Sequence, residues 1–397
     1  MRNIKYFHLS LIIFVAGAGT ASADDHVRVA TFNISFNRRS AGDLTKDLSD
    51  MNPQAIKVAT ILRTVRPDIV LLNEVDFDED GTAILLFQQQ YLQAISLPGD
   101  TDPLYLSHLW SGPVNTGIPS GRDLDNNGLI GGPADSYGFG WFPGQFGMVV
   151  LSRFPIQTES VRTFQRLLWK DMPDARRPVD PDTGRHWYSD ENWNALRLSS
   201  KSHWDVPINV NGKRLHILAS HPTPPAFDGP EDRNGCRNAD EIRFWVDYLT
   251  PGLSNWIQDD TGVFGGLAAD AHFCILGDLN ADPIDGGSVT GAVGRLIEHP
   301  RVNSQLVPQS EGAVRASSEQ EGKNRQHHAP AANDTADFSD KTVGNLRVDF
   351  VLPSRTLQVM SGGVFWPAPG DAGTELLDCS DHRLVWINIG LPENAAD

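Results

Sequence analysis

The chain has 397 residues and a formal net charge of −17 at pH 7, with 33 Lys and Arg against 50 Asp and Glu. No dense basic run in the sequence offsets this charge, so the chain repels polyanions and nucleic acid is a disfavoured substrate. Its three cysteines are too few for a disulfide scaffold. Cys274 lies in an apolar run and is expected to be a buried thiol, whereas a bridge between Cys236 and Cys379 stays open.

The first residues have the pattern of a secretory signal peptide. Arg2 and Lys5 precede an apolar stretch over 9–18, and a small-residue site ends at Ala23. The apolar stretch is roughly half as long as a membrane-spanning helix requires, so we expect no transmembrane anchor. The pattern predicts cleavage after residue 23 and export to the periplasm or the medium. Residues 24–397 show no break in composition and are expected to form a single domain and a monomer.

Short apolar runs alternate with helical patterns along the rest of the chain. The predicted strands span 27–34, 69–72, 148–151, 215–219, 273–276, 348–352 and 384–389. The predicted helices span 54–65, 82–95, 238–248 and 288–297. This alternation predicts a layered α/β fold. Stretches 97–145 and 308–341 are rich in loop-forming or polar residues and are expected to be long loop insertions.

Polar side chains recur where the predicted strands end or begin. The residues concerned are Asn33, Glu74, His221, Asp278, Asn280, Asp349, Asp381 and His382. Each of them alone has an ordinary explanation, because an Asn or Asp at a strand end often caps a turn. Together they supply the carboxylates, amides and imidazoles that bind a hard cation, polarise a phosphoryl group and activate water.

Five short motifs occur in an order that resembles the endonuclease/exonuclease/phosphatase superfamily, which has the deoxyribonuclease-I-like fold. They are Thr31-Phe32-Asn33-Ile34, Leu72-Asn73-Glu74-Val75, the run from Gly147 to Ile156, Gly277-Asp278-Leu279-Asn280, and Ser380-Asp381-His382. The resemblance extends over 27–389. It implies an exported bacterial-type member of the family with a four-layer α/β/β/α sandwich, in which two face-to-face β-sheets are flanked by helices and the site lies at one edge.

The resemblance also implies a metal site. Glu74 corresponds to the principal ligand of Mg²⁺ or Mn²⁺, and Asp381 and Asn33 would complete the coordination of one or two ions. Oxygen ligands suit such hard cations. One departure concerns Ser35, which stands where abasic-site endonucleases have Asp, and this weakens a DNA-repair interpretation.

The remaining residues of the site receive catalytic roles from the same resemblance. His382 would be the base or transition-state partner at the phosphate, with its imidazole held by Asp349. Asp278 would position or activate the attacking water, and Asn280 would hold a phosphoryl oxygen. His221 would protonate or stabilise the leaving side.

Two loops have both a functional and a structural interpretation. After His221, the polar run over 223–235 could bring Arg233 and Asn234 to the phosphate, or it could be a surface loop that caps the next helix. Around 123–128, alternating oxygen side chains followed by Gly are typical of a calcium loop. Its candidate ligands for a structural Ca²⁺ are Asp123, Asp125 and Asn127. The closing Glu is missing, since position twelve is Ala134 and Asp135 comes one place late, so an ordinary turn is the alternative.

The sequence therefore predicts a secreted or periplasmic metal-dependent phosphoesterase. It would hydrolyse phosphomono- or phosphodiester bonds of a small ester or headgroup by direct attack of an activated water. A secreted nuclease is the alternative, and it would need a basic strip, for which the candidates are Arg162, Arg166, Lys170, Arg176, Arg177 and Arg185. A non-catalytic binding module on the same fold is a more remote alternative. Several tryptophans of the loops could line a substrate site or serve in packing: Trp110, Trp141, Trp169, Trp187 and Trp193.

Overall fold

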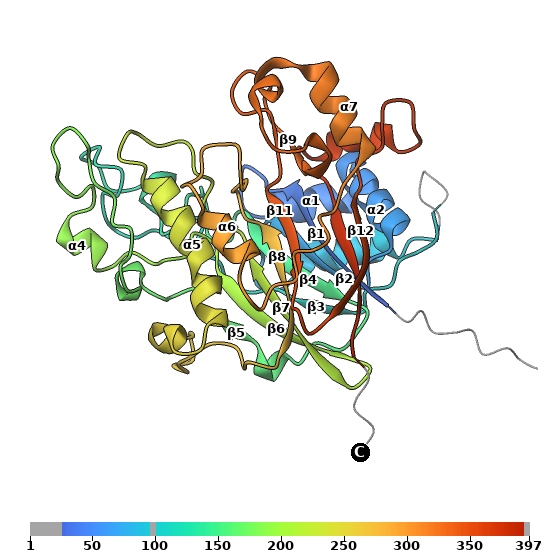
Figure 1. Ribbon diagram of the computed structural model, residues 1–397, viewed down its shortest axis with the longest axis horizontal. Helices are drawn as coiled ribbons and strands as arrows, with labels where there is room; N and C mark the ends of the chain where they lie inside the picture. Colours follow the sequence, from blue (N-terminus) through green and yellow to red (C-terminus); the bar gives the residue numbers. More distant parts are fainter. Residues whose placement is uncertain (1–25, 96–100, 393–397) are drawn as a thin grey trace, which may run out of the picture.

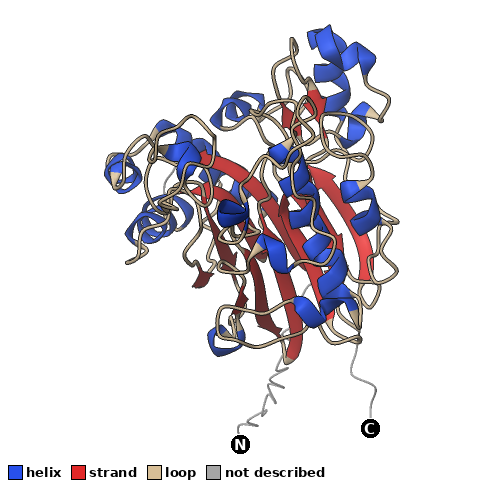
Figure 2. Cartoon of the chain, turned by 90° about the vertical axis from the view of Figure 1, so that its left-hand side faces the viewer, coloured by secondary structure: helices blue, strands red, loops and turns tan. Residues whose placement is uncertain are grey.

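The computed structural model describes residues 26–95 and 101–392, so the expected signal peptide over 1–23 lies outside the described residues. Two β-sheets form the centre of the molecule (Figures 1 and 2). The larger sheet has six strands in the order β12-β13-β1-β2-β4-β3. These strands are β1 Val27–Phe36, β2 Ile69–Val75, β3 His108–Trp110, β4 Gly147–Ser152, β12 Gln358–Val364 and β13 Val385–Gly390.

The second sheet has five strands in the order β11-β8-β7-β6-β5. Its strands are β5 Arg162–Thr163, β6 His203–Val210, β7 Lys213–Ser220, β8 His272–Asp278 and β11 Asp349–Pro353. A tight Asn211-Gly212 turn joins β6 to β7, with φ of 51° and 87° at these two residues. Both values suit the primed turns that match the twist of a hairpin. A separate small sheet pairs β9 Ala336–Asp337 with β10 Asn345–Leu346.

Helices cover the outer face of each sheet, as Figure 1 shows for α1 and α2 on one side and α5 on the other. The α-helices are α1 Asp43–Ser49, α2 Pro53–Val65, α3 Thr82–Phe87, α4 Asp190–Trp193, α5 Arg233–Leu249, α6 Ala292–Ile297 and α7 Glu311–Gln320. A π-helical turn, Gln88–Leu92, continues α3. Short 3₁₀ helices occur at Pro133–Asp135, Thr158–Ser160, Trp169–Asp171, Leu253–Trp256, Gly322–Gln326, Ala331–Asn333 and Thr374–Cys379.

Three apolar clusters establish the four layers. Phe32 of β1 packs with Leu62 of α2 in the first cluster, on the outer face of the larger sheet. The second cluster joins strands of both sheets and fills the space between them. In the third, Phe273 of β8 packs with Phe244 and Trp245 of α5. The arrangement confirms the predicted α/β/β/α sandwich, in which each sheet buries both faces.

Local signals explain where several of these elements begin and end. Helix α2 starts at Pro53 because the side chain of Asn52 caps the N–H of Ala55, and it ends where Arg66 adopts a left-handed conformation before Pro67. The expectation of a plain loop over 308–341 was wrong. Ser310 caps α7 by accepting from the N–H of Ala313, and the first residue of β9 forms a bridge with His382.

Other sequence expectations can also be compared with the structure. Cys236, Cys274 and Cys379 are all free, so the bridge that the sequence left open does not form, and Cys274 is buried as expected. Among the described residues, every helix is too short or too polar to span a bilayer.

His203 of β6 connects the second sheet to α5 through a buried polar contact. It is 1% exposed, its ring lies 4.4 Å from that of Phe244, and its Nε2 hydrogen-bonds the carbonyl oxygen of Glu241 at 2.8 Å. The Ser199 hydroxyl lies 2.5 Å from Nδ1. Burial lowers the pKa of His203 to about 4, so the imidazole is neutral in the folded protein at neutral pH.

This burial should make folding stability sensitive to acid. The unfolded chain, with an ordinary histidine pKa, binds a proton that the folded chain resists, so stability falls as the pH drops from about 6.5 toward about 4. Between about pH 7.5 and about pH 5, the wild type should lose about 2 kcal/mol more unfolding free energy than His203→Gln. Urea unfolding of both proteins at the two pH values measures this difference, and parallel losses would contradict the assignment.

Candidate active site

The predicted site residues lie at one end of the sandwich, where strands of both sheets end or begin. Asn33 is in β1, Glu74 in β2, and Asp278 is the last residue of β8. Asp349 is the first residue of β11 and pairs directly with Asp278. Because β1 and β2 are parallel, as are β7 and β8, the carboxyl ends of each pair meet at one edge.

Asp278 is the buried centre of this arrangement. Its side chain is 1% exposed, and its Oδ2 accepts from the Asn33 amide at 3.1 Å while its Oδ1 accepts from the Asn280 N–H at 2.9 Å. His221 Nε2 lies 3.4 Å and His382 Nε2 lies 3.6 Å from the same Oδ2. Burial alone would raise the pKa of Asp278, but the two imidazoles and the hydrogen bonds hold it well below its usual value. The carboxylate is therefore ionised.

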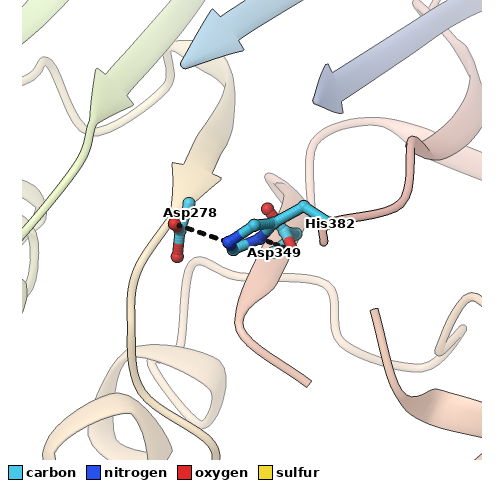
Figure 3. Close-up of side chains that lie close together, drawn as sticks. All are labelled: Asp278, Asp349 and His382. Carbon is cyan, nitrogen blue, oxygen red and sulfur yellow. Dashed lines mark hydrogen bonds and ion pairs between the residues drawn. The ribbon is translucent and has the colours of Figure 1, made fainter. Parts of the chain in front are cut away.

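His382 lies between two carboxylates, as Figure 3 shows. Its Nδ1 is 2.9 Å from Asp349 Oδ2, and its Nε2 faces Asp278. Burial opposes the charged form, but Asp349 and Asp278 outweigh it and raise the pKa of His382 above its usual value. The two carboxylates thus favour the protonated ring, which suits the role of proton donor or transition-state partner better than that of a resting base.

Thr335 fixes the orientation of Asp349, and the sequence did not single it out. The Thr335 hydroxyl donates to Asp349 Oδ2 at 2.9 Å and accepts from the Asp349 backbone N–H at 3.0 Å. The side chain is 1% exposed. Thr335 precedes β9 in the stretch that was expected to be a loop, so no strand-end pattern could mark it.

Glu74 and Asn33, two of the residues predicted to bind the metal, are hydrogen-bonded to each other. Glu74 Oε1 accepts from the Asn33 amide at 3.1 Å, and Oε2 accepts from the Asn37 amide at 2.8 Å. The carboxylate is partly exposed and keeps lone pairs for a cation. Asp381, with 55% of its side chain exposed, lies 4.0 Å from His382 Nε2, and its coordination of the same ion stays a prediction.

A second donor group in the site is more compact but suits a metal less well. Ligand atoms of Asp278, Asp349 and His382 all lie within 4.8 Å of one another. However, both nitrogens of His382 face carboxylates that favour the protonated ring, whereas a metal ligand must be a deprotonated imidazole. The oxygen donors around Glu74 therefore fit Mg²⁺ or Mn²⁺ better, and the compact group fits proton transfer.

His221 and Asn280 also lie in the site, next to Asp278. Within the described residues, the buried Nδ1 of His221 has no hydrogen-bond partner. The side-chain amide of Asn280 donates to the Pro222 carbonyl at 3.1 Å, which leaves one of its two N–H groups. The predicted roles of both residues at the phosphate stay predictions.

Arg233 and Asn234 have partners inside their own loop. Arg233 forms an ion pair with Glu231, and Asn234 bonds the Ala226 carbonyl with its side chain and the Asp228 carboxylate with its N–H. These contacts stabilise the start of α5. Their predicted contact with substrate stays a prediction.

Lys201 is a residue of the site that sequence reasoning missed. It precedes β6, is 6% exposed, and interacts electrostatically with Glu241, Glu74 and Asp278. Burial lowers the pKa of Lys201, and these three carboxylates oppose the shift. A buried lysine is rare unless it is paired with acids. Its position reflects packing between the sheets, which leaves no local pattern in the sequence.

The 123–135 loop folds as a compact acidic turn. The carboxylates of Asp123, Asp125 and Asp135 lie within 4.8 Å of one another, so Asp135 stands where the closing acid was missing. The Asn127 side chain bonds Asp125 Oδ2 at 2.9 Å and accepts from the Leu129 N–H. Backbone N–H groups occupy several of these oxygens, and a structural Ca²⁺ stays a prediction.

Metal addition distinguishes the two oxygen clusters. We expect Mg²⁺ or Mn²⁺ to raise the melting temperature of the wild type and of Asp123→Asn. Neither ion should raise the melting temperature of Glu74→Gln, because this substitution removes the charged metal ligand of the candidate active site. If the 123–135 loop binds Ca²⁺, this ion should raise the melting temperature of the wild type and of Glu74→Gln, but not of Asp123→Asn. Differential scanning fluorimetry with each ion and with EDTA measures these shifts. An unchanged Mg²⁺ or Mn²⁺ response in Glu74→Gln would exclude Glu74 as the principal ligand.

Comparisons with known proteins identify the family of the chain. Residues 30–382 match the model of the Endonuclease/Exonuclease/phosphatase family. A search of curated proteins gave no match. One solved structure, an endonuclease/exonuclease/phosphatase from Beutenbergia cavernae DSM 12333, is 17% identical with a TM-score of 0.50, and the match covers 92% of this chain and 72% of that one.

Two further solved structures are similar over most of their length. A family protein from Leptotrichia buccalis C-1013-b is 13% identical, with a TM-score of 0.44 and coverage of 91% of this chain and 98% of that one. The human Nocturnin catalytic domain with bound sulfate anion is 13% identical, with a TM-score of 0.42 and coverage of 92% and 94%. The match to the family model spans most of the chain. The chain therefore belongs to the Endonuclease/Exonuclease/phosphatase family, whose members hydrolyse phosphoester bonds and generally depend on a divalent metal.

Proposed function

We propose that this chain is an exported, metal-dependent phosphoesterase that hydrolyses a phosphomono- or phosphodiester bond of a small molecule or headgroup. The observation that carries the proposal is the buried His382 imidazole held between Asp349 and Asp278, with Asn33 linking Asp278 to Glu74 by hydrogen bonds. Proton donor, water-orienting carboxylate and cation ligand thus converge on one small volume. Export rests on the signal pattern over 1–23.

Each group has a role that follows from its charge. The depressed pKa of Asp278 makes it a weak base, so it orients the attacking water by accepting a hydrogen bond. His382 donates from Nε2 to a phosphoryl oxygen as charge develops there. His221 Nε2 lies 3.4 Å from the same carboxylate and adds a donor near the equatorial oxygens, and Lys201 interacts electrostatically with that carboxylate.

A bound Mg²⁺ or Mn²⁺, held by Glu74 with Asn33 and Asp381, would supply a Lewis acid that withdraws charge from the phosphoryl oxygens. Asn37 and Asn33 fix both oxygens of the Glu74 carboxylate in place. This pre-arrangement avoids reorganisation when charge builds up.

Charge favours a small substrate over a polymer. The chain carries a net charge of −17, and the arginines proposed for a basic strip are in part neutralised. Arg162 pairs with Asp259 at 2.7 Å, and Arg177 pairs with Asp190 at 2.8 Å. A strip of this kind attracts a nucleic-acid backbone less strongly than its sequence suggests. The nuclease alternative is therefore treated as an outcome of the test.

The proposal is tested with mature protein and a set of esters. We expect hydrolysis of mono- or bis-4-nitrophenyl phosphate with Mg²⁺ or Mn²⁺, no hydrolysis with EDTA, and intact plasmid DNA under the same conditions. His382→Ala should reduce the rate by roughly 10²–10⁴-fold, because it removes the proton donor. Preferential cleavage of DNA would establish the nuclease instead, and inactivity toward all three substrates would favour the non-catalytic module.

The pair of Asp349 and Thr335 allows a graded test of how the imidazole is held. Asp349→Asn should lower kcat by roughly 10²–10⁴-fold with little change in KM, because an amide favours the wrong protonation and orientation of His382. Thr335→Val removes the hydroxyl that donates to the Asp349 carboxylate and accepts from the N–H groups of Val348 and Asp349, and it should lower kcat by about 10-fold. Thr45→Val in α1, where the side chain is partly exposed, is the matched control. Equal rates in Thr335→Val and the wild type would contradict the positioning role.

A further inference from the structure

An open hollow lies beside the proposed metal ligand. Its volume is about 770 Å³, and it is lined by Asn37, Arg38, Arg39, Trp141, Gln145 and Phe146. The Asn37 amide that faces it donates to Glu74 Oε2 at 2.8 Å. One wall of the hollow is therefore a single hydrogen bond away from the reaction centre. A substrate with its phosphate at Glu74 would have room there for the rest of the molecule.

Two buried polar side chains hold the walls of the hollow together. Asp76, 7% exposed, accepts from the backbone N–H of Arg38 at 2.7 Å and of Phe146 at 3.2 Å. Gln145, 3% exposed, donates to the Arg38 carbonyl at 2.6 Å and accepts from the Trp141 N–H at 2.8 Å. The loop after β1 and the end of the 97–145 insertion are thus joined into one rigid rim. Such a rim is pre-organised for a ligand.

The rim presents two groups that stack on flat rings. Trp141 is 68% exposed, whereas Trp169, Trp204 and Trp245 are fully buried. Arg39 is exposed, and within the described residues its guanidinium has no hydrogen-bond or ion-pair partner. In contrast, the guanidinium of Arg38 is engaged by Asp47 and Gln54. Indole and guanidinium planes both stack on heterocyclic rings.

We propose that this hollow is a specificity subsite that binds a planar heterocyclic ring of the substrate, stacked on Trp141 and flanked by Arg39. The inference rests on the proposed phosphoesterase activity and specifies its substrate as a ring-bearing phosphate ester. The mixed lining, with Trp141 and Phe146 beside four polar or charged side chains, suits a flat ring that carries polar edge groups. The net charge of −17 favours a single ring-bearing unit over a polymer.

Substrate pairs that differ in the ring test the subsite. Adenosine 5′-monophosphate and ribose 5-phosphate differ only in adenine, and phosphate release reports both. Thymidine 5′-(4-nitrophenyl phosphate) and methyl 4-nitrophenyl phosphate form the diester pair; they share the nitrophenyl leaving group and differ in thymidine against methyl, and nitrophenol release reports both. We expect the wild type to prefer the member with the heterocyclic base in the pair that it hydrolyses. In Trp141→Ala, the ratio of the two kcat/KM values should fall by about 10-fold or more, because the stacking surface is lost. The ratio should fall less in Arg39→Ala, and Trp141→Phe should retain most of it, because its side chain is still aromatic.

Phe139→Ala is the matched control, because Phe139 is 57% exposed on the same loop but does not line the hollow. Using the ratio within each variant cancels any general loss of folded protein. An unchanged ratio in Trp141→Ala, or a wild type without preference for the ring, overturns the subsite.

A binding measurement separates this inference from the proposed function. Adenosine 5′-monophosphate should quench part of the tryptophan fluorescence of the wild type and of Phe139→Ala, and this part should be missing in Trp141→Phe. Quenching through Trp141 in a protein that hydrolyses none of the four esters would support the subsite and refute the phosphoesterase. Hydrolysis of methyl 4-nitrophenyl phosphate, together with equal quenching in Trp141→Phe and the wild type, would support the phosphoesterase and refute the subsite.

Discussion

The ionised carboxylate of Asp278, almost fully removed from water, is the constraint on which the rest of the structure depends. A buried charge of this kind is tolerated only when partners compensate it, and removal of one partner destabilises a protein by about 3–5 kcal/mol. The partners of Asp278 are Asn33 of β1, His221 after β7, Asn280 after β8 and His382 before β13. They come from both sheets, so correct packing of the two sheets and assembly of the site are one requirement.

The same constraint explains the irregular backbone around the site. Glu74, Ser35 and Asn280 have φ of 60°, 51° and 52°, a conformation that disfavours residues other than glycine. The pairing of β1 with β2 shifts register after Asn33, and that of β2 with β4 shifts on either side of Glu74. Such bulges redirect a side chain at the end of a strand. They turn Glu74 toward the amide of Asn33, where regular strands would leave the two side chains apart.

Sequence patterns predicted the parts of this structure that local signals encode. The strands that carry Asn33, Glu74 and Asp278 are apolar runs with polar ends, and motif order sufficed for the family and the four-layer fold. Lys201 escaped detection because its electrostatic interactions with Glu74 and Asp278 join segments far apart in the chain. Thr335 escaped detection because it bonds Asp349 from a stretch that was expected to be a loop. Helix α7 was missed since its sequence is polar, and a single serine cap marks its start.

The residues proposed for the reaction and those proposed for substrate selection lie in different parts of the structure. Buried strand ends hold Asp278 and His382, and a substitution there disturbs the compensation of a buried charge. The rim that carries Trp141 is instead fixed through its backbone, because Gln145 and Asp76 bond main-chain groups of the neighbouring loops. The side chain at position 141 can therefore change without loss of the rim or of the charge balance at Asp278. A fold built in this way can keep one phosphoester chemistry while its loop insertions adapt to different substrates.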